Sequence, residues 1–313
     1  MSNTKTFYAY KIINETLGLA HSPLKDHLCT KLRSDADCFR NRCKPIIQNS
    51  TTEDVLASFL PINTNNPYIG GEMWRIAPSK DMPKIPQSLF ERESVTADEV
   101  PEDPTVSPTD KSRTDTHYFI VTEDRLITTF PISRIQQFAK YLNSLLAVYR
   151  GDIEYKFEPL IMLPTNVALS DITSIVFSDR PIYENGRIKK GNSKYHLFKV
   201  GINNLKALFD DFGNTKELID QKILSATMTI KLSRPSKMTD EIYKQRLSAL
   251  LKPLSADDVD GVSFKLSNGE KIKAMTIHAK TNHSFNPEVE SERENIRNAC
   301  TAMYEYYQTL QRQ

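Results

Sequence analysis

The sequence predicts an α+β protein made mostly of antiparallel sheets with flanking helices. Segments that alternate apolar and polar residues are intermixed with segments of helical spacing, and no regular strand–helix–strand repeat links them. The turn pair Asn268-Gly269 lies between two alternating runs, which favours a tight antiparallel hairpin. With 313 residues and a hydrophobic fraction of 39%, the chain can bury one large core or two smaller ones.

A stretch rich in acids and prolines divides the chain. Over residues 91–116 acidic side chains outnumber basic ones, prolines recur and large apolar residues are scarce. This composition indicates a linker or mobile loop. The sequence therefore predicts an N-terminal α+β part over 1–90, an acidic linker over 91–116 and a second α+β domain over 117–313.

The N-terminal part contains two predicted strands and a short helix. Thr6–Ile13 reads as a strand by its aromatic and β-branched content, and Pro67–Pro78 reads as another with a glycine pair inside it. Between them, Ser50 and Glu53 stand in capping-box register before the apolar run VLASFL, which predicts a short helix.

The second domain begins with His117–Phe130, two apolar runs that predict a hairpin. A helix is expected next, with Ser133 and Gln136 as its capping box and Gly151 as its stop. The closing helix is expected to begin at Asn286, followed by a proline at the first helical position. Further strands are expected at Ile153–Leu163, Ser174–Asp179 and Ile223–Leu232, a helix at Asp240–Leu251, and the Asn268-Gly269 hairpin within Gly261–Ala279.

No sequence signature of a catalytic or cofactor site occurs. The chain has only 10 glycines and lacks a glycine-rich phosphate loop, and it lacks the nucleophile-elbow, zinc-protease and EF-hand motifs. We therefore expect neither an enzyme nor a cofactor.

Two weaker constellations have alternative interpretations. His27, Cys29, Cys38 and Cys43 could supply zinc ligands, but their spacing is not that of a zinc knuckle or ribbon, so we favour reduced, metal-free thiols. The segment DIEYK, residues 152–156, could belong to a metal-dependent nuclease strand. Alternating charge on the solvent face of a half-buried strand is the commoner origin of such a pattern.

Basic side chains gather in the second half of the chain, although the net charge is only +2. In the hairpin, Val262, Phe264 and Leu266 alternate with Ser263, Lys265 and Ser267, and Ile272 alternates with Lys271 and Lys273. One face is therefore apolar and the other carries three lysines. A cationic sheet face can neutralise DNA phosphates, but solubility alone also places lysine on exposed strands. The basic residues that we single out are Arg187, Lys189 and Lys190 before the hairpin, Lys231, Arg234 and Lys237 nearer to it, and Lys265, Lys271 and Lys273 within it.

Several segments together carry a family resemblance. They are the opening FYAYK, then HYFIVTEDRLITTF, NSLLA, FEPLI, SIVFSDR, NLKALFDDFG, TMTIKLSRPSK and VSFKLSNGE, followed by the closing helix with its tyrosines and methionine. In order and character they resemble the RexA family, the DNA-binding component of the phage lambda Rex exclusion system. The resemblance covers about two-thirds of the chain.

The resemblance implies a homodimer that binds duplex DNA largely without sequence preference, together with a small membrane-protein effector as a further partner. It carries a DNA-contact role onto Lys231, Arg234 and Lys265. The segment from Leu17 to Phe90 departs from the family pattern, and Ser267 stands where the family strand has a cation.

We therefore expect a cytoplasmic, DNA-binding sensor or scaffold of prophage or anti-phage defence. The nine basic residues named above are the expected DNA contacts. Met303, Tyr307 and Leu310 of the closing helix are expected to contribute to a dimer contact, with core packing inside one chain as the alternative. A protein-interaction adaptor without DNA binding is the second hypothesis, and a nuclease is the third.

Overall fold

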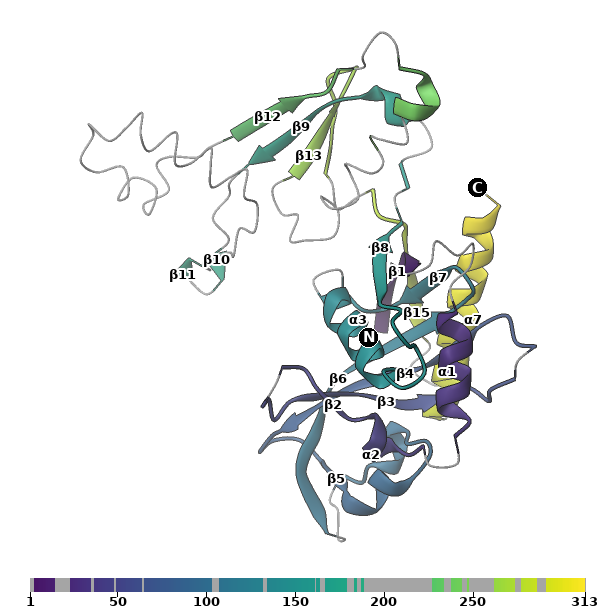
Figure 1. Cartoon of the computed structure of the whole chain (residues 1–313). Coiled ribbons are helices and arrows are strands. Elements are labelled where there is room, and N and C mark those ends of the chain that lie inside the picture. The colour runs from purple at the N-terminus through teal and green to yellow at the C-terminus, as the bar shows by residue number, and fades with distance from the viewer. Residues whose placement is uncertain are drawn as a thin grey trace. The chain divides into compact units, whose positions relative to one another are not determined.

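The chain folds into two compact units (Figure 1). Unit 1 comprises Met1–Met162 with His278–Gln313, and unit 2 comprises most of the residues between them. The helices and antiparallel strands of both confirm the predicted α+β class. The computed structural model describes residues 3–14, 23–34, 37–47, 49–63, 65–102, 107–131, 134–160, 162–163, 167–178, 183–184, 187–188, 227–233, 238–243, 247, 262–273, 277–285 and 291–312.

Unit 1 is built on a nine-stranded sheet with the strand order β15-β1-β7-β6-β4-β3-β2, in which β5 also pairs with β6 and β8 with β1. All pairs are antiparallel. The predicted strands at β1, β4 and β8 and the predicted β6–β7 hairpin are confirmed. The strands are β1 (Asn3–Asn14), β2 (Lys44–Pro45), β3 (Glu53–Phe59), β4 (Ile69–Pro78), β5 (Lys84–Pro86), β6 (Pro108–Val121), β7 (Arg125–Thr128), β8 (Tyr155–Pro159) and β15 (Lys280–Phe285).

The middle of this sheet is buried on both faces. Phe119 and Ile120 are neighbours in β6, so they point to opposite faces, and both are fully buried. Phe119 packs in the cluster formed with α1 (Leu24–Leu32) and α3 (Ile135–Leu145), whereas Ile120 packs under the long closing helix. The uninterrupted apolar run of β6 follows from this two-sided burial.

The closing helix α7 (Glu292–Gln311) covers one face of the sheet with Ile296, Cys300 and Met303. It begins later than the predicted Asn286, because Ser291 is the N-cap and its Oγ accepts a hydrogen bond from the Glu294 amide at 3.3 Å. Residues 286–290 lie outside the described residues. Helix α3 is confirmed, but it spans Ile135–Leu145 and ends before the predicted stop at Gly151. The expected cap Ser133 lies outside the described residues.

The predicted helix after Ser50 is wrong, because this segment forms β3, which pairs with β2 and β4. Ser50 Oγ accepts a hydrogen bond from the Thr52 amide at 3.0 Å, and Asn49 has a φ of 66°. The supposed capping residue therefore stabilises a turn into a strand, which is the common competing use of serine. The side chains in the middle of β3 are all buried, which favours an extended strand for this apolar run.

The acidic stretch 91–116 lies inside unit 1 rather than between the two units, which corrects the predicted division of the chain. Its C-terminal half enters β6, and Val95 is fully buried. Val95 packs in a third apolar cluster beside α2 (Phe39–Arg42), which also includes Trp74. The remaining short helical turns of this region are η1 (Gln87–Glu91) and η2 (Ala97–Glu99).

A glycine in β4 allows α7 to approach the sheet closely. A Cβ atom placed on Gly70 would lie 2.5 Å from Cys300 Sγ and 3.2 Å from Ile120 Cγ2. We expect Gly70→Ala to lower the free energy of unfolding by about 1–3 kcal/mol, measured by urea denaturation. Adding Cys300→Ala should recover part of that loss, and a double variant no more stable than Gly70→Ala would contradict this contact.

Unit 2 contains a four-stranded antiparallel sheet with the order β12-β9-β13-β14. The predicted hairpin is confirmed as β13 and β14, joined at Gly269, whose φ of 89° suits glycine. Most of the predicted helix Asp240–Leu251 lies outside the described residues. The elements are η4 (Leu169–Asp171), β9 (Ile172–Ser178), β10 (Tyr183–Glu184), β11 (Arg187–Ile188), β12 (Thr227–Lys231), β13 (Val262–Leu266) and β14 (Lys271–Lys273).

Candidate nucleic-acid interface

The strand register of unit 2 aligns three lysines in one row across the sheet. Lys231 of β12 and Lys265 of β13 both pair with Ser174 of β9, and Lys265 also pairs with Lys271 of β14. Directly paired residues of antiparallel strands point to the same face. The three lysines are exposed and share one face, whereas Ser174 between them is buried.

A second row on the same face adds a fourth lysine. Thr229 and Ser263 both pair with Val176, and Ser263 also pairs with Lys273. The alternate positions Ile175 and Phe264 point to the opposite face and are buried. We call Lys231, Lys265, Lys271 and Lys273 the lysine face.

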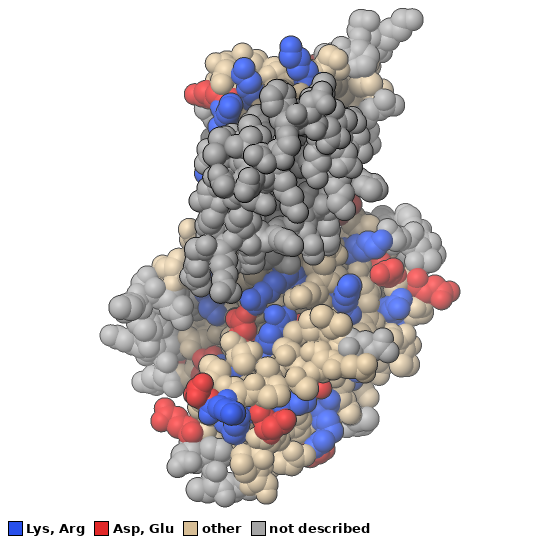
Figure 2. Space-filling model, turned by 90° about the vertical axis from the view of Figure 1, so that its left-hand side faces the viewer, with Lys and Arg blue, Asp and Glu red and all other residues tan. Residues whose placement is uncertain are grey.

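The lysine face is cationic. Its four strands contain no acidic residue over their described spans. Strands lie ~4.8 Å apart, so the row from β12 to β14 is ~14 Å wide. A duplex presents one phosphate charge per ~1.7 Å of axis, and this width therefore matches several phosphates. Figure 2 shows basic side chains on the described part of unit 2.

The other predicted DNA contacts are only partly described. Arg187 lies in β11, where its backbone pairs with that of Glu184 in a short two-stranded ribbon. Lys189, Lys190, Arg234 and Lys237 lie outside the described residues. Sequence reasoning missed Ser174, the common partner of two lysines, because no local pattern shows which strand lies between β12 and β13.

The three residues expected at a dimer contact lie against their own chain. Met303 is fully buried and Leu310 is 6% exposed, so neither side chain has appreciable surface for a second copy. Tyr307 is partly exposed, and its hydroxyl donates to Asp124 Oδ1 at 3.1 Å. Core packing therefore accounts for Met303 and Leu310, and homodimerisation stays a prediction.

The residues considered as zinc ligands make other contacts. His27 Nδ1 lies 2.6 Å from the hydroxyl of Tyr155, and Cys29 is buried. Burial raises the pKa of the Cys43 thiol to about 12, which makes it a poor nucleophile and a poor ligand. All four cysteines are free. Among the described residues, no group of three or more His, Cys, Asp or Glu side chains is arranged to bind a metal ion.

The DIEYK segment leads into β8, a half-buried strand. Tyr155 and Phe157 are buried, whereas Lys156 and Glu158 are partly exposed. Glu154, the acid that a nuclease would need, is exposed just before the strand. Buried and partly exposed side chains alternate along β8, as expected for a strand with one face toward solvent.

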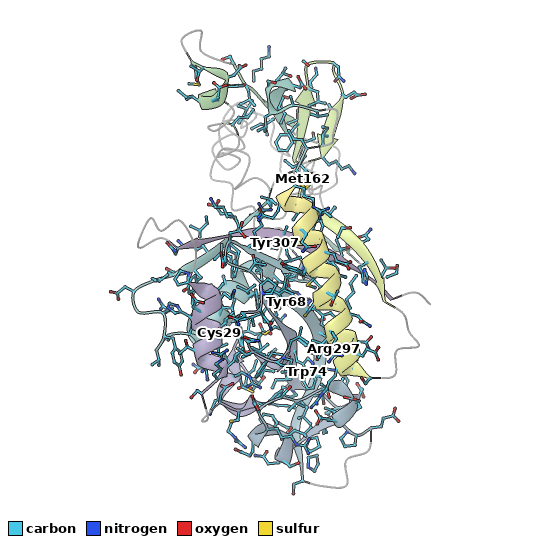
Figure 3. All side chains as sticks on the ribbon, turned by 90° about the vertical axis from the view of Figure 1, so that its right-hand side faces the viewer. Cys29, Tyr68, Trp74, Met162, Arg297 and Tyr307 are labelled. Carbon is cyan, nitrogen blue, oxygen red and sulfur yellow. The ribbon has the colours of Figure 1, made fainter. Side chains whose placement is uncertain are left out.

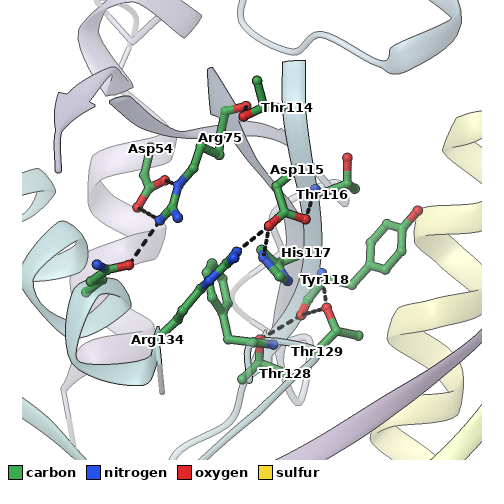
Figure 4. A network of polar contacts seen from close by, with 12 residues as sticks. Asp54, Arg75, Thr114, Asp115, Thr116, His117, Tyr118, Thr128, Thr129 and Arg134 are labelled. Carbon is green, nitrogen blue, oxygen red and sulfur yellow. Dashed lines mark hydrogen bonds and ion pairs between the residues drawn. The ribbon is translucent and has the colours of Figure 1, made fainter. Parts of the chain in front are cut away.

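A polar network in unit 1 contains a histidine but no activated nucleophile among its described residues (Figure 4). His117 Nε2 lies 3.2 Å from Asp115 Oδ2, and Arg134 pairs with the same carboxylate. Burial lowers the pKa of His117, so its ring is neutral at neutral pH. The hydroxyls of Thr128 and Thr129 both donate to the Tyr118 carbonyl. The network therefore ties β6 to β7 and α3.

In the described part of the chain, no helix combines the length and apolar character needed to cross a membrane. Comparison of the chain with protein-family models, with curated proteins and with solved structures gives no match.

Proposed function

We propose that this chain is a RexA-like protein that binds duplex DNA without sequence preference and acts as a cytoplasmic sensor or scaffold in phage exclusion. The observation that carries the proposal is the alignment of Lys231, Lys265 and Lys271 in one exposed row. Lysine ammonium groups contact phosphates as point charges, which positions a protein on DNA without reading bases.

The residues around this row also support a contact with the phosphate backbone of DNA rather than with its bases. No aromatic residue occupies the described positions on the lysine face, so the face has no platform for stacking bases. Lys231 and Lys265 are also two of the three positions that the family resemblance assigns to DNA. The basic residues outside the described part, among them Arg234 and Lys237, are proposed to add further phosphate contacts.

The test is a binding titration with two labelled duplexes of unrelated sequence at several salt concentrations. We expect equal affinity for both duplexes and a log–log salt slope near −4.5 for about five phosphate contacts. Replacing Lys231, Lys265 and Lys271 together by alanine should weaken binding roughly ten- to a hundredfold and flatten the slope by about 2.7, because three contacts are lost.

A matched control removes the same charge from unit 1. Lys11, Lys80 and Lys140 are exposed there, and their combined replacement by alanine should leave the salt slope unchanged. Equal losses in both triple variants would mean that only total charge matters and would remove the assigned face. Absence of duplex binding even at low salt would remove the function.

The adaptor hypothesis uses the same face for an acidic protein. It predicts a complex that survives nuclease treatment and depends on Lys265. The homodimer and the membrane-protein effector are proposals of the resemblance alone, and sedimentation and co-purification test them separately.

A further inference from the structure

Unit 1 buries a carboxyl group that makes no well-formed hydrogen bond with any described residue. Glu72 of β4 is fully buried and points under α7, on the same face as its cross-strand partner Tyr118. Among the described residues, neither carboxyl oxygen of Glu72 has a hydrogen bond of good geometry, although the indole nitrogen of Trp74 and the carboxyl group of Glu292 both approach it. A buried acid without a well-formed hydrogen bond is costly to ionise, so its presence calls for an explanation.

Charged groups face Glu72 from every element packed around it. Arg113 of β6 places Nη1 3.9 Å from Glu72 Oε1 and 3.7 Å from Glu292 Oε1, so it lies between the two carboxyl groups. Glu292 belongs to the first turn of α7. From β1, Lys5 Nζ lies 4.7 Å from the ring centre of Tyr118. Cys300, further along α7, also interacts electrostatically with Glu72. We call Lys5, Glu72, Arg113, Tyr118 and Glu292 the Glu72 cluster.

The cluster favours the neutral form of Glu72. Burial is the largest cause that raises the pKa of Glu72, repulsion by Glu292 is the second, and together they raise it to about 8. Arg113 opposes this shift but at 3.9 Å does not cancel it. Burial also lowers the pKa of Lys5, and the nearby carboxyl groups of Glu72 and Glu292 act against this shift.

We propose that Glu72, Glu292 and Arg113 form a proton-dependent contact that fixes the first turn of α7 to the sheet. With a proton on Glu72, Arg113 faces one carboxylate, that of Glu292. Without that proton, two carboxylates share Arg113, one of them fully buried, and their repulsion displaces the turn that carries Glu292. The device makes the attachment of α7 sensitive to alkaline pH.

Trp74 reports on this contact, because it is the single tryptophan of the chain and lies beside the N-terminal part of α7 (Figure 3). Its ring lies 5.2 Å from the guanidinium carbon of Arg113. We expect tryptophan fluorescence of the full chain, titrated between about pH 6 and about pH 10, to change with a midpoint near 8. Hydrogen exchange of the amides at Glu292–Asn295 should accelerate through the same midpoint relative to Glu72→Gln at equal pH.

Three variants decide the matter. Glu72→Gln keeps the shape but cannot ionise, so the transition should vanish, whereas Glu292→Gln removes the like charge and should lower the midpoint. Glu123→Gln is the control, because Glu123 is exposed on the β6–β7 turn, and it should leave the curve unchanged. A flat wild-type curve, a transition retained in Glu72→Gln, or an unmoved midpoint in Glu292→Gln would each overturn the proposal.

Thermal unfolding gives a second readout with a definite sign. The pKa of Glu72 in the folded chain, about 8, lies above its ordinary value of 4.5, so the folded state holds the proton more tightly. This stabilisation is complete below about 4.5 and is lost as the pH rises through about 8. Glu72→Gln should therefore gain in Tm relative to the wild type as the pH rises, and parallel Tm curves would contradict the proposal.

Discussion

Replacing Arg42 by alanine is expected to lower the free energy of unfolding by about 3–5 kcal/mol, because it breaks a buried ion pair. Arg42 is fully buried in α2, and its guanidinium donates to Asp37 and to the backbone carbonyls of Leu56 and Glu93. Alanine removes all three contacts and leaves Asp37, whose side chain is also fully buried, with Lys31 as its remaining cation. Urea denaturation measures the loss.

The same helix offers a matched control. Arg40 pairs with Glu91 at 2.7 Å, but both side chains are largely exposed, 48% and 67%. Exposed pairs contribute little, so Arg40→Ala should cost at most about 1 kcal/mol. Similar losses for both arginines would show that burial of the Arg42 pair has no special weight.

Replacing Phe138 by alanine is expected to lower the free energy of unfolding by about 3–5 kcal/mol. Phe138 is the centre of an aromatic group between α3 and the sheet, with ring centroids 4.7 Å from Phe130, 5.4 Å from Phe119 and 5.9 Å from Phe157. Alanine leaves a cavity and removes these ring contacts together. Phe138→Leu should cost less, because most of the volume is kept.

Val148→Ala is the control for this core substitution, since Val148 is 90% exposed. It should change stability by less than about 0.5 kcal/mol. If Phe138→Ala proved as mild as Val148→Ala, α3 would not be fixed to the sheet through this aromatic group.

The sequence predicted correctly those hairpins whose two strands are close together along the chain. The β13–β14 hairpin has a left-handed turn glycine between two alternating runs, and the β6–β7 hairpin has two apolar runs around Glu123 and Asp124. Helix α3 was predicted from a capping-box pair at its start, and the structure confirms a helix there. In each case the signal lies within about a dozen residues.

Long-range pairing explains the failures. The segment VLASFL is apolar enough for either a helix or a strand, and its place between β2 and β4 decides for the strand. The polar composition of the acidic stretch predicts a linker, yet its C-terminal part pairs along β4. In both cases the residues of the segment alone do not show which strand it will pair with.

The lysine face was half predictable. Alternation in the hairpin predicted that Lys265 and Lys271 share a face, but the alignment of Lys231 with them depends on β9 lying between β12 and β13. Glu72 had one signal in the sequence, a lone acid inside the apolar strand around Trp74, and we did not single it out. The burial of Glu72 can be recognised only from the structure, because the helix that covers it, α7, is distant in the sequence.

The route of the chain through unit 1 has a genetic consequence. The chain leaves unit 1 after β8 and returns before β15, and both strands pair with β1. At these two points the Ala279 amide donates to the Leu160 carbonyl at 2.8 Å. Most of unit 2 is thus an insert between β8 and β15, and its entry and exit points meet. Such points tolerate excision and exchange. One recombination event could replace the lysine-bearing cassette while every strand of the larger sheet stays intact.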